Sequence, residues 1–200
     1  MNIYLIRHGE TAKNREKRLQ GRSDTPLNEN GHQQSAKARA YFEQQGIRFD
    51  RVYSSPLIRA VQTAAAIVGE GVEIETDERL LEMDYGPYEG STLENPAPEL
   101  IRFFSDFVNN PAPEGMESLE HVTQRLGDFL NEICKKAGEN VLISTHAIAM
   151  KGALEYLTPD SRGGYWSKYI GNCGIYRAEY TGGQFTPPEE IFSLGYEPGV

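Results

Sequence analysis

The sequence of 200 residues contains little cysteine and no long apolar run, and each shortage excludes a class of protein. The two cysteines, Cys134 and Cys173, lie far apart and match no CxxC or Cys/His spacing, which argues against a disulfide scaffold and a zinc site. We therefore expect buried, unreactive thiols in a cytoplasmic protein. Uncharged runs such as Val141 to Met150 fall well short of the roughly 20 residues of a membrane-spanning helix. The first residues lack a signal-peptide pattern, so we expect no membrane partner.

Positive charge is also scarce, with 20 Lys and Arg against 29 Asp and Glu and a net charge of −9. This balance argues against a surface that attracts nucleic acid or anionic lipid. Residues 1–22 are the exception, because they hold six basic residues and only two acidic ones. The basic stretch Lys13 to Arg22 has two interpretations: it is an ordinary solvated loop, or it steers an anionic substrate toward a site.

The apolar content of 38% and the aromatic content of 10% are typical of a folded chain, whose length suits a single domain, residues 1–200. Short apolar strands alternate with helical patterns, and this alternation favours a parallel sheet covered by helices on both faces. The predicted fold is α/β, a three-layer α/β/α sandwich with a mostly parallel central sheet. A small helical cap insertion is expected at about residues 92–117, where prolines bracket a short apolar piece.

The expected elements follow from hydrophobic periodicity and from helix start and stop signals. We expect strands at 2–6, 51–54, 72–76 and 141–144, and an edge hairpin formed by 174–180 and 190–194. We expect helices at 30–45, from a Ser55 N-cap with Pro56 at the first helical position to 68, and at 100–108, 118–137 and 147–157.

Histidine and arginine follow directly after the predicted buried strands. Arg7 and His8 end the first strand, and His146 follows the strand at 141–144. Ligands of open α/β sheets bind at the carboxyl ends of the strands, and Arg59 arrives there just after a third strand. Guanidinium groups match phosphate oxygens, and a neutral imidazole can act as a nucleophile or a hydrogen-bond donor. The sequence therefore predicts a phosphate site that contains a nucleophile.

These residues form part of a longer pattern. In five blocks, taken in order, the chain resembles the histidine phosphatase superfamily, also called phosphoglycerate mutase-like. The blocks are Arg7-His8-Gly9-Glu10-Thr11 with Asn14 and Gln20-Gly21; Ser54-Ser55-Pro56-Leu57 with Arg59, Gln62 and Thr63; Leu81-Glu82 with Asp84, Gly86, Tyr88, Glu89 and Gly90; residues 113–118 with Arg125; and Val141 to His146. Two positions depart from the family, namely Lys13, where an aromatic residue is frequent, and Ala147-Ile148, where Gly-Gly is frequent.

The resemblance implies the catalytic roles. His8 attacks the substrate phosphorus and becomes a phosphohistidine, while Arg7, Arg59 and His146 hold the phosphoryl oxygens. Glu82 is the general acid that protonates the leaving oxygen and then the base that activates water. No metal and no cofactor is required by this scheme.

Other matching residues are expected to bind the substrate. Asn14 joins the phosphate pocket, and the backbone N–H of Ala147 is available for a phosphate oxygen. Gln20 and Gly21 complete the substrate-binding residues that the first block implies. Asp84 and Glu89 compete with the catalytic carboxylate for its role, because they stand in the same block.

The leading functional hypothesis is a metal-independent phosphomonoester phosphatase of a small phosphorylated metabolite. The alternative within the family is a cofactor-dependent phosphoglycerate mutase. A third hypothesis, from another class, is a catalytically silent module that binds phosphorylated ligands. The sequence does not choose among phosphosugars, phosphoserine, phosphoglycerates and α-ribazole phosphate as substrate, and it leaves the oligomeric state open.

Overall fold

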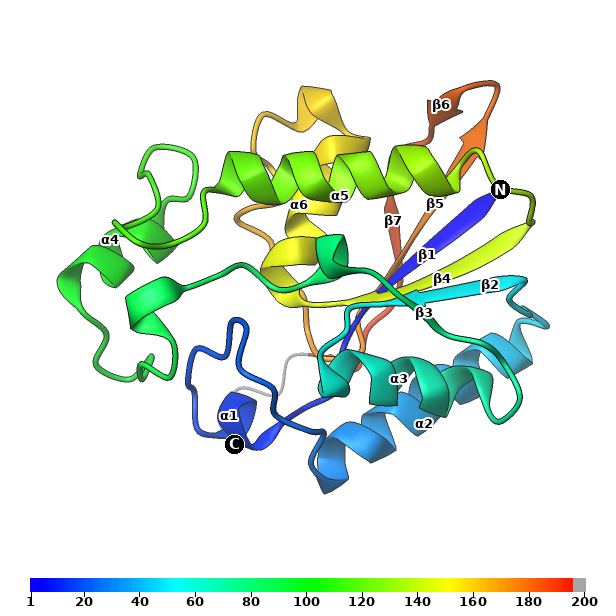
Figure 1. Ribbon diagram of the computed structural model, residues 1–200, viewed down its shortest axis with the longest axis horizontal. Helices are drawn as coiled ribbons and strands as arrows, with labels where there is room; N and C mark the ends of the chain where they lie inside the picture. The colour runs from blue at the N-terminus through cyan, green and yellow to red at the C-terminus, as the bar shows by residue number, and fades with distance from the viewer. Residues whose placement is uncertain (196–200) are drawn as a thin grey trace.

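A computed structural model describes residues 1–195 and contains a seven-stranded mixed sheet covered by helices (Figure 1). The strands are β1 (Asn2–Arg7), β2 (Arg51–Ser54), β3 (Glu75–Thr76), β4 (Asn140–Thr145), β5 (Ile175–Thr181), β6 (Gln184–Phe185) and β7 (Glu189–Phe192). The helices are α1 (Ala12–Arg15), α2 (Glu29–Gln44), α3 (Ile58–Val68), α4 (Pro98–Ser105), α5 (Leu119–Ile133) and α6 (Ala147–Leu157), with short 3₁₀ turns η1 (Glu78–Leu80), η2 (Gly86–Tyr88) and η3 (Pro159–Ser161). No helix in this described part of the chain is long and apolar enough to cross a membrane.

The strand order is β3-β2-β4-β1-β5-β6, and β7 also pairs with β5. The strands β3, β2, β4 and β1 pair in parallel, whereas β5 joins β1, β6 and β7 in antiparallel pairs. Arg7 of β1 lies in register with Thr145 of β4. The residues that follow, His8 and His146, therefore leave neighbouring strands at the same edge. The mostly parallel sheet and the antiparallel edge agree with the sequence prediction.

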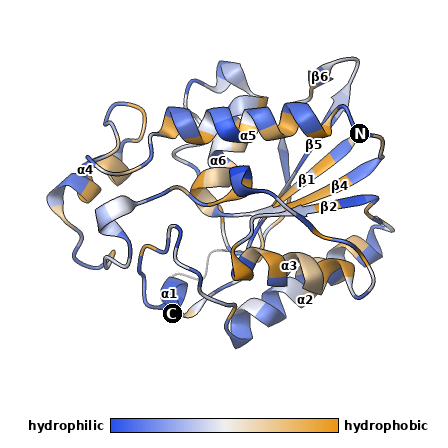
Figure 2. Cartoon of the chain, in the orientation of Figure 1, coloured by the Kyte–Doolittle hydropathy of each residue, from blue (hydrophilic) through white to orange (hydrophobic). Residues whose placement is uncertain are grey.

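Side chains of the central strands alternate between two cores. Ile3 and Leu5 of β1 pack with residues of α5 and α6, whereas Tyr4 and Ile6 pack with residues of α2 and α3. Figure 1 shows these two helix pairs on opposite faces of the sheet, and Figure 2 shows that the central strands and α3 are predominantly apolar. The three-layer α/β/α sandwich predicted from the sequence is confirmed.

The start of α3 differs from the prediction, because the helix begins at Ile58 rather than directly after a Ser55 N-cap. Ser55 instead continues the pairing of β2 with β4, since its N–H donates to the carbonyl of Ser144 at 2.9 Å. The acceptor at the helix start is Asp24, whose Oδ1 accepts from the N–H of Ile58 at 2.7 Å. A carboxylate there satisfies an unpaired N–H and complements the helix dipole. Local spacing could not reveal an acceptor from so distant a loop.

Three other predicted elements are shorter than expected, so their boundaries were wrong. The strand expected at 72–76 is reduced to β3, whose two residues are exposed at the sheet edge. The helix expected at 100–108 ends at Ser105, because the side chain of Asp106 accepts from the next N–H groups, at Val108 and Asn109, and so favours a turn. The helix expected at 118–137 ends at Ile133, where the final turn tightens.

Two glycines let the loop after β1 approach the first turn of α2. A Cβ on Gly31 would lie 2.1 Å from the carbonyl oxygen of Glu10, and a Cβ on Gly9 would lie 2.6 Å from the carbonyl oxygen of Gly31. Both obstacles are backbone atoms, which cannot rotate away as a side chain can. This contact fixes the segment that follows His8 against α2.

Replacing Gly31 with Ala should therefore destabilise the protein by about 1 to 3 kcal/mol, the usual cost of an overpacked contact. Thermal or denaturant unfolding of the variant against the parent protein measures the change. Gly171→Ala is the matched control, because a Cβ there meets only the ring of Tyr169, at 3.6 Å. The control should change the free energy of unfolding by less than about 0.5 kcal/mol. Equal destabilisation by both substitutions would contradict the close-contact argument.

Candidate active site

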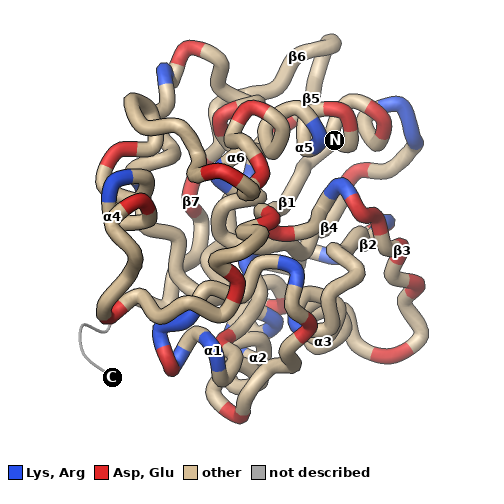
Figure 3. Tube along the Cα trace, turned by 60° about the vertical axis from the view of Figure 1, so that its left-hand side comes forward, with Lys and Arg blue, Asp and Glu red and all other residues tan. Residues whose placement is uncertain are grey.

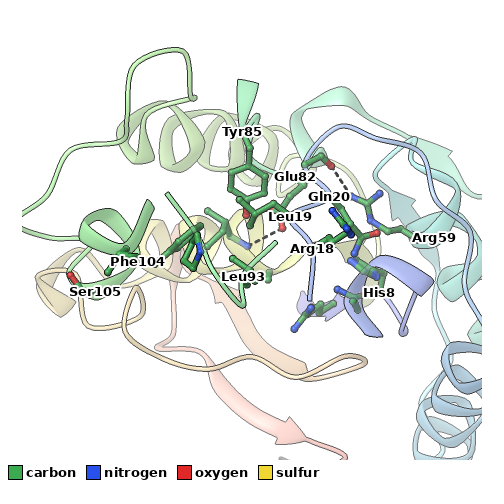
Figure 4. Close-up of a pocket in the computed structure, with 17 residues that line it drawn as sticks. His8, Arg18, Leu19, Gln20, Arg59, Glu82, Tyr85, Leu93, Phe104 and Ser105 are labelled. Atoms are coloured by element: carbon green, nitrogen blue, oxygen red, sulfur yellow. Dashed lines mark hydrogen bonds between the residues drawn. The ribbon is translucent and has the colours of Figure 1, made fainter. Parts of the chain in front are cut away.

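A cavity of about 520 Å³ opens at the carboxyl ends of β1 and β4 (Figure 4). Its volume lies within the range of small-molecule sites, roughly 300 to 1,000 Å³. Eight of the nine predicted site residues line the cavity: Arg7, His8, Asn14, Gln20, Gly21, Arg59, Glu82 and Ala147. The ninth, His146, is in contact with His8, with the two ring centroids 5.2 Å apart.

His8 is buried and is held in one orientation by its own loop. Its Nδ1 lies 2.7 Å from the carbonyl oxygen of Gly9, so Nδ1 carries the proton and donates it to that oxygen. Burial, together with the positive charges of Arg59 and Arg7, holds the pKa of His8 well below its usual range. The imidazole is therefore neutral near pH 7, with its lone pair on Nε2. A neutral imidazole fixed in this tautomer can act as a nucleophile through Nε2.

Arg59 reaches the cavity from the first turn of α3, and only 1% of it is exposed. Its Nη1 donates to the carbonyl of Ser23 at 2.7 Å, and its Nη2 donates to the carbonyl of Gly21 at 2.8 Å. Each terminal nitrogen carries two protons, so one proton on each is left for an anion. Burial lowers the pKa of Arg59 to about 10, so the guanidinium keeps its charge near pH 7.

His146 is fully buried at the N-cap of α6. Its Nδ1 accepts from Nε of Arg59 at 3.1 Å, so its proton is on Nε2, which donates to Oγ of Ser55 at 2.7 Å. Burial, with the positive charge of Arg59 and the neighbouring His8, holds the pKa of His146 well below its usual range. The contact with Ser55 was not foreseen, and the role of His146 in holding a phosphoryl oxygen stays a prediction.

Arg7 and two amide side chains supply further donors. Nη1 of Arg7 donates to the carbonyl of Ile170 at 2.6 Å, whereas its buried Nε has no partner among the described residues. Asn14 accepts through Oδ1 from the N–H of Thr11 at 3.1 Å, and Gln20 accepts through Oε1 from the hydroxyl of Thr11 at 2.9 Å. The amide NH₂ groups of both are thereby left to donate to an anion.

Glu82 is buried against the first turn of α6. Its Oε1 accepts from the N–H of Met83 at 2.9 Å and from that of Ala149 at 3.0 Å, and its Oε2 accepts from the N–H of Ile148 at 3.3 Å. Two of these donors are orphan N–H groups of a helix N-terminus, where a carboxylate is favoured by the dipole. Ala147, the first residue of the same helix, lines the cavity beside it.

The competing carboxylates point elsewhere. Asp84 accepts through Oδ1 from the N–H of Gly86 at 2.7 Å, and Glu89 accepts through Oε1 from the N–H of Arg22 at 2.6 Å. Neither residue lines the cavity, so Glu82 is the carboxylate that faces it within residues 1–195. The structure therefore favours Glu82 among the three candidates that the sequence left open.

A buried ion pair holds the loop that carries Glu82. Arg125 donates through Nε and Nη2 to the carboxylate of Glu117, at 2.7 and 3.1 Å. Burial opposes the charged form of Glu117, but the hydrogen bonds and charge of Arg125 outweigh it and lower the pKa of Glu117. Nη1 of Arg125 donates to the carbonyls of Arg79 at 2.7 Å and of Leu81 at 2.6 Å. The pair therefore fixes the backbone directly before Glu82.

The basic stretch Lys13 to Arg22 is joined to the segment 90–93 by three backbone hydrogen bonds. The ion pair of Lys17 with Glu94, at 3.7 Å, lies beside them. Figure 3 shows the basic residues of this stretch gathered around α1. Among its cations, Arg18 lines the cavity. Much of the stretch thus connects two segments of chain, and its proposed steering of substrate stays a prediction.

Sequence reasoning missed the apolar wall of the cavity. These side chains come from three separate parts of the chain and match no catalytic motif. The only signal was the bracketing of 96–113 by prolines, which marked a cap without saying which residues face the site. The missed residues are Leu19, Tyr85, Leu93, Pro96, Ile101 and Phe104, whereas Ile148, noted beside Ala147 in the sequence, also lines the cavity.

We predict that neither His8 nor His146 becomes protonated between about pH 8 and pH 6, whereas an unshifted histidine titrates near 6.5. NMR of the imidazole Cε1–H signals measures this, with His8→Gln and His146→Gln assigning the peaks. Because the unfolded chain binds protons that the folded chain does not, the free energy of unfolding should also fall as the pH drops below about 6.5. A titration midpoint at or above that value would contradict the buried, cationic setting.

Known proteins resemble this chain over most of its length. The family model of the histidine phosphatase superfamily (branch 1) matches residues 3–188. A putative phosphoserine phosphatase 2 of Hydrogenobacter thermophilus is 32% identical over 179 residues, which is 86% of this chain and 86% of that protein. A probable phosphoglycerate mutase GpmB of Yersinia pestis is 32% identical over 186 residues, covering 90% of this chain and 85% of that protein.

The fold is likewise shared with solved structures. A phosphoserine phosphatase from Entamoeba histolytica, solved in complex with 3-phosphoglyceric acid, superposes with a TM-score of 0.82 at 28% sequence identity. The superposition covers 96% of this chain and 98% of that one.

Proposed function

The chain belongs to branch 1 of the histidine phosphatase superfamily, and from this premise we propose that it is a metal-independent phosphomonoester phosphatase. It acts through a phosphohistidine on a small phosphorylated metabolite. The observation that carries the proposal is the neutral His8, oriented by the Gly9 carbonyl, beside two guanidinium groups and the carboxyl of Glu82 in one cavity. The phosphatases among its relatives support hydrolysis as the reaction.

In the first step Nε2 of His8 attacks phosphorus, and the bond from phosphorus to the ester oxygen breaks. Glu82, which carries a proton when the substrate is bound, gives that proton to the leaving oxygen and returns to the carboxylate form that its backbone N–H partners favour, so the product is an alcohol. The transferring phosphoryl group spreads negative charge over three oxygens, which the guanidinium groups of Arg7 and Arg59 stabilise best where water is excluded.

In the second step water attacks the phosphohistidine. Glu82, now a carboxylate, takes a proton from the water while the bond from phosphorus to Nε2 breaks. The products are inorganic phosphate and neutral His8, so the site returns to its starting state. Glu82 carries the proton in both steps, since it gives one to the leaving oxygen and regains one from water, and Arg7 and Arg59 supply positive charge to the phosphoryl oxygens.

The cavity also supports hydrolysis over mutase activity. A mutase must hold the carboxylate of its glycerate in two orientations, which needs cations beyond those that bind the phosphoryl group. Outside the phosphate-binding groups, Arg18 is the basic residue that lines the cavity in the described chain. Its Nη1 is occupied by the carbonyl of Gly90 at 2.8 Å, and its Nε lies 3.4 Å from Glu16.

We further propose that residues 1–200 form one domain in which residues 92–117 act as a cap over the cavity. The cap is supported by Leu93, Ile101 and Phe104, which line the site from this segment. The last five residues of the proposed domain, 196–200, lie outside the described residues. The free thiols of Cys134 and Cys173 support the cytoplasmic location expected from the sequence.

We expect His8→Ala to abolish turnover and formation of the acid-labile phosphoenzyme, assayed by phosphate release and by ³²P labelling in excess EDTA. Glu82→Gln should keep phosphate binding but lower kcat by about 10²-fold or more, the usual worth of general acid catalysis. His32→Ala is the control, because His32 is exposed on α2.

Full activity of His8→Ala, or loss of parental activity in EDTA that returns with magnesium or zinc, would overturn the mechanism. A parent protein that binds phosphate without hydrolysing any ester would favour the silent module.

With 3-phosphoglycerate as substrate we expect slow release of inorganic phosphate and no accumulation of 2-phosphoglycerate. The reason is that, apart from the phosphate-binding groups, Arg18 is the basic side chain that lines the cavity in the described chain. Phosphorus NMR of the reaction mixture follows both products at once. Rapid formation of 2-phosphoglycerate without free phosphate would favour the mutase instead.

A further inference from the structure

The two ends of the catalytic cavity differ in chemistry. One end holds the phosphate-binding groups, and the other is lined by the apolar wall described above. Figure 4 shows Phe104 and Ser105 at the end opposite His8 and Arg59, with Tyr85 and Leu93 between them. The ring of Phe104 packs against that of Tyr85, with centroids 6.4 Å apart. A substrate whose phosphoryl group contacts His8 therefore places its alcohol portion against these apolar side chains.

Some of this apolar wall is exposed to water. Leu93 is 44% exposed and Ile101 is 54% exposed. Both are among the few large apolar side chains that are exposed to solvent in residues 1–195. Water in contact with large apolar side chains is unfavourable, by about 25 cal/mol per Å². An apolar ligand body that covers these residues removes that water, which is a source of binding energy specific to such ligands.

The same region offers few partners to polar substrates. Its polar side chains are Ser105 and Arg18; the charge of Arg18 is paired with Glu16 at 3.4 Å, and its Nη1 donates to the carbonyl of Gly90. Apart from the catalytic Glu82, no acidic side chain lines the described cavity, so an ammonium group finds no second counter-ion. The ammonium, carboxylate or hydroxyl groups of a polar metabolite would lose water here without a matched partner, which is costly.

We propose that the substrate of this protein is a phosphate monoester with an apolar alcohol portion, an alkyl or aryl phosphate. The phosphoryl group binds among Arg7, His8 and Arg59, and the hydrocarbon lies against Phe104, Ile101 and Leu93. The substrate class rests on the proposed phosphatase function. It narrows that function to esters without charge or hydroxyl groups on the alcohol side.

A series of n-alkyl phosphates from ethyl to octyl tests the substrate class. The leaving alcohols in this series have nearly equal acidity, so differences in kcat/KM report binding of the chain rather than bond cleavage. We expect kcat/KM to rise by up to about four-fold per buried methylene, the equivalent of ~0.8 kcal/mol, until the cavity is filled. A flat or falling series would overturn the proposal.

Two matched variants test whether the apolar wall causes the dependence of kcat/KM on chain length. Ile101→Asn should lower kcat/KM for hexyl phosphate by about 10-fold more than kcat/KM for ethyl phosphate, because about two methylene contacts of the longer chain are lost. Ile101 is half exposed, so the change does not open the core. Val108→Asn is the control, because Val108 is 58% exposed just beyond α4 and does not line the cavity. Equal losses in both variants would overturn the assignment of the wall.

Phosphoserine tests the proposed substrate class separately from the proposed phosphatase activity. O-phospho-L-serine and propyl phosphate have carbon chains of the same length, and we expect the propyl ester to be hydrolysed with the higher kcat/KM. Faster hydrolysis of phosphoserine would overturn the apolar substrate while leaving the phosphatase intact. If no ester in either set released phosphate and no phosphohistidine formed, the proposed function itself would fail, and the substrate class with it.

Discussion

The buried guanidinium of Arg59 is the constraint on which the rest of the site depends. It is almost entirely inaccessible to water, and within residues 1–195 its hydrogen bonds go to no carboxylate. Two carbonyl oxygens and the Nδ1 of His146 hold it instead. A buried charge is expensive when its direct contacts are neutral dipoles, although the charges of Glu82 and Asp24 act on Arg59 from beyond hydrogen-bonding distance. The phosphoryl group of the proposed substrate would bring further negative charge to this guanidinium.

This positive setting also determines the state of the two histidines. Protonation of either imidazole would add a charge beside Arg59, and burial opposes it further, so both stay neutral. His8 is thereby kept in the form that the proposed nucleophile requires, under conditions in which a free histidine is partly protonated. The net charge of −9 over the whole chain gives no hint of this. Local burial, rather than overall charge, controls the chemistry of the cavity.

The carboxylate of the site is positioned from farther away. Arg125 links Glu117 to the backbone before Glu82, and the hydroxyl of Thr145 donates to the carbonyl of Leu80 at 2.8 Å. The first turn of α6 then fixes the carboxylate itself. The segments that carry His8 and Glu82 thus meet at the carboxyl ends of β1 and β4, which are neighbours in the sheet.

The layered α/β fold could be predicted from the sequence, because strand and helix periodicities are local properties of the chain. The polar end of the cavity could be predicted too, because residues such as His8, Arg59 and Glu82 belong to short motifs that are local in the sequence. Helix boundaries that depend on distant partners, such as the Asp24 carboxylate at the start of α3, were beyond local spacing. The apolar wall depends on how the chain folds in space, because Leu19, Tyr85 and Phe104 come from separate segments. The sequence pattern does not distinguish an apolar side chain in the core from one that lines a cavity, because that difference depends on which segments the fold brings together.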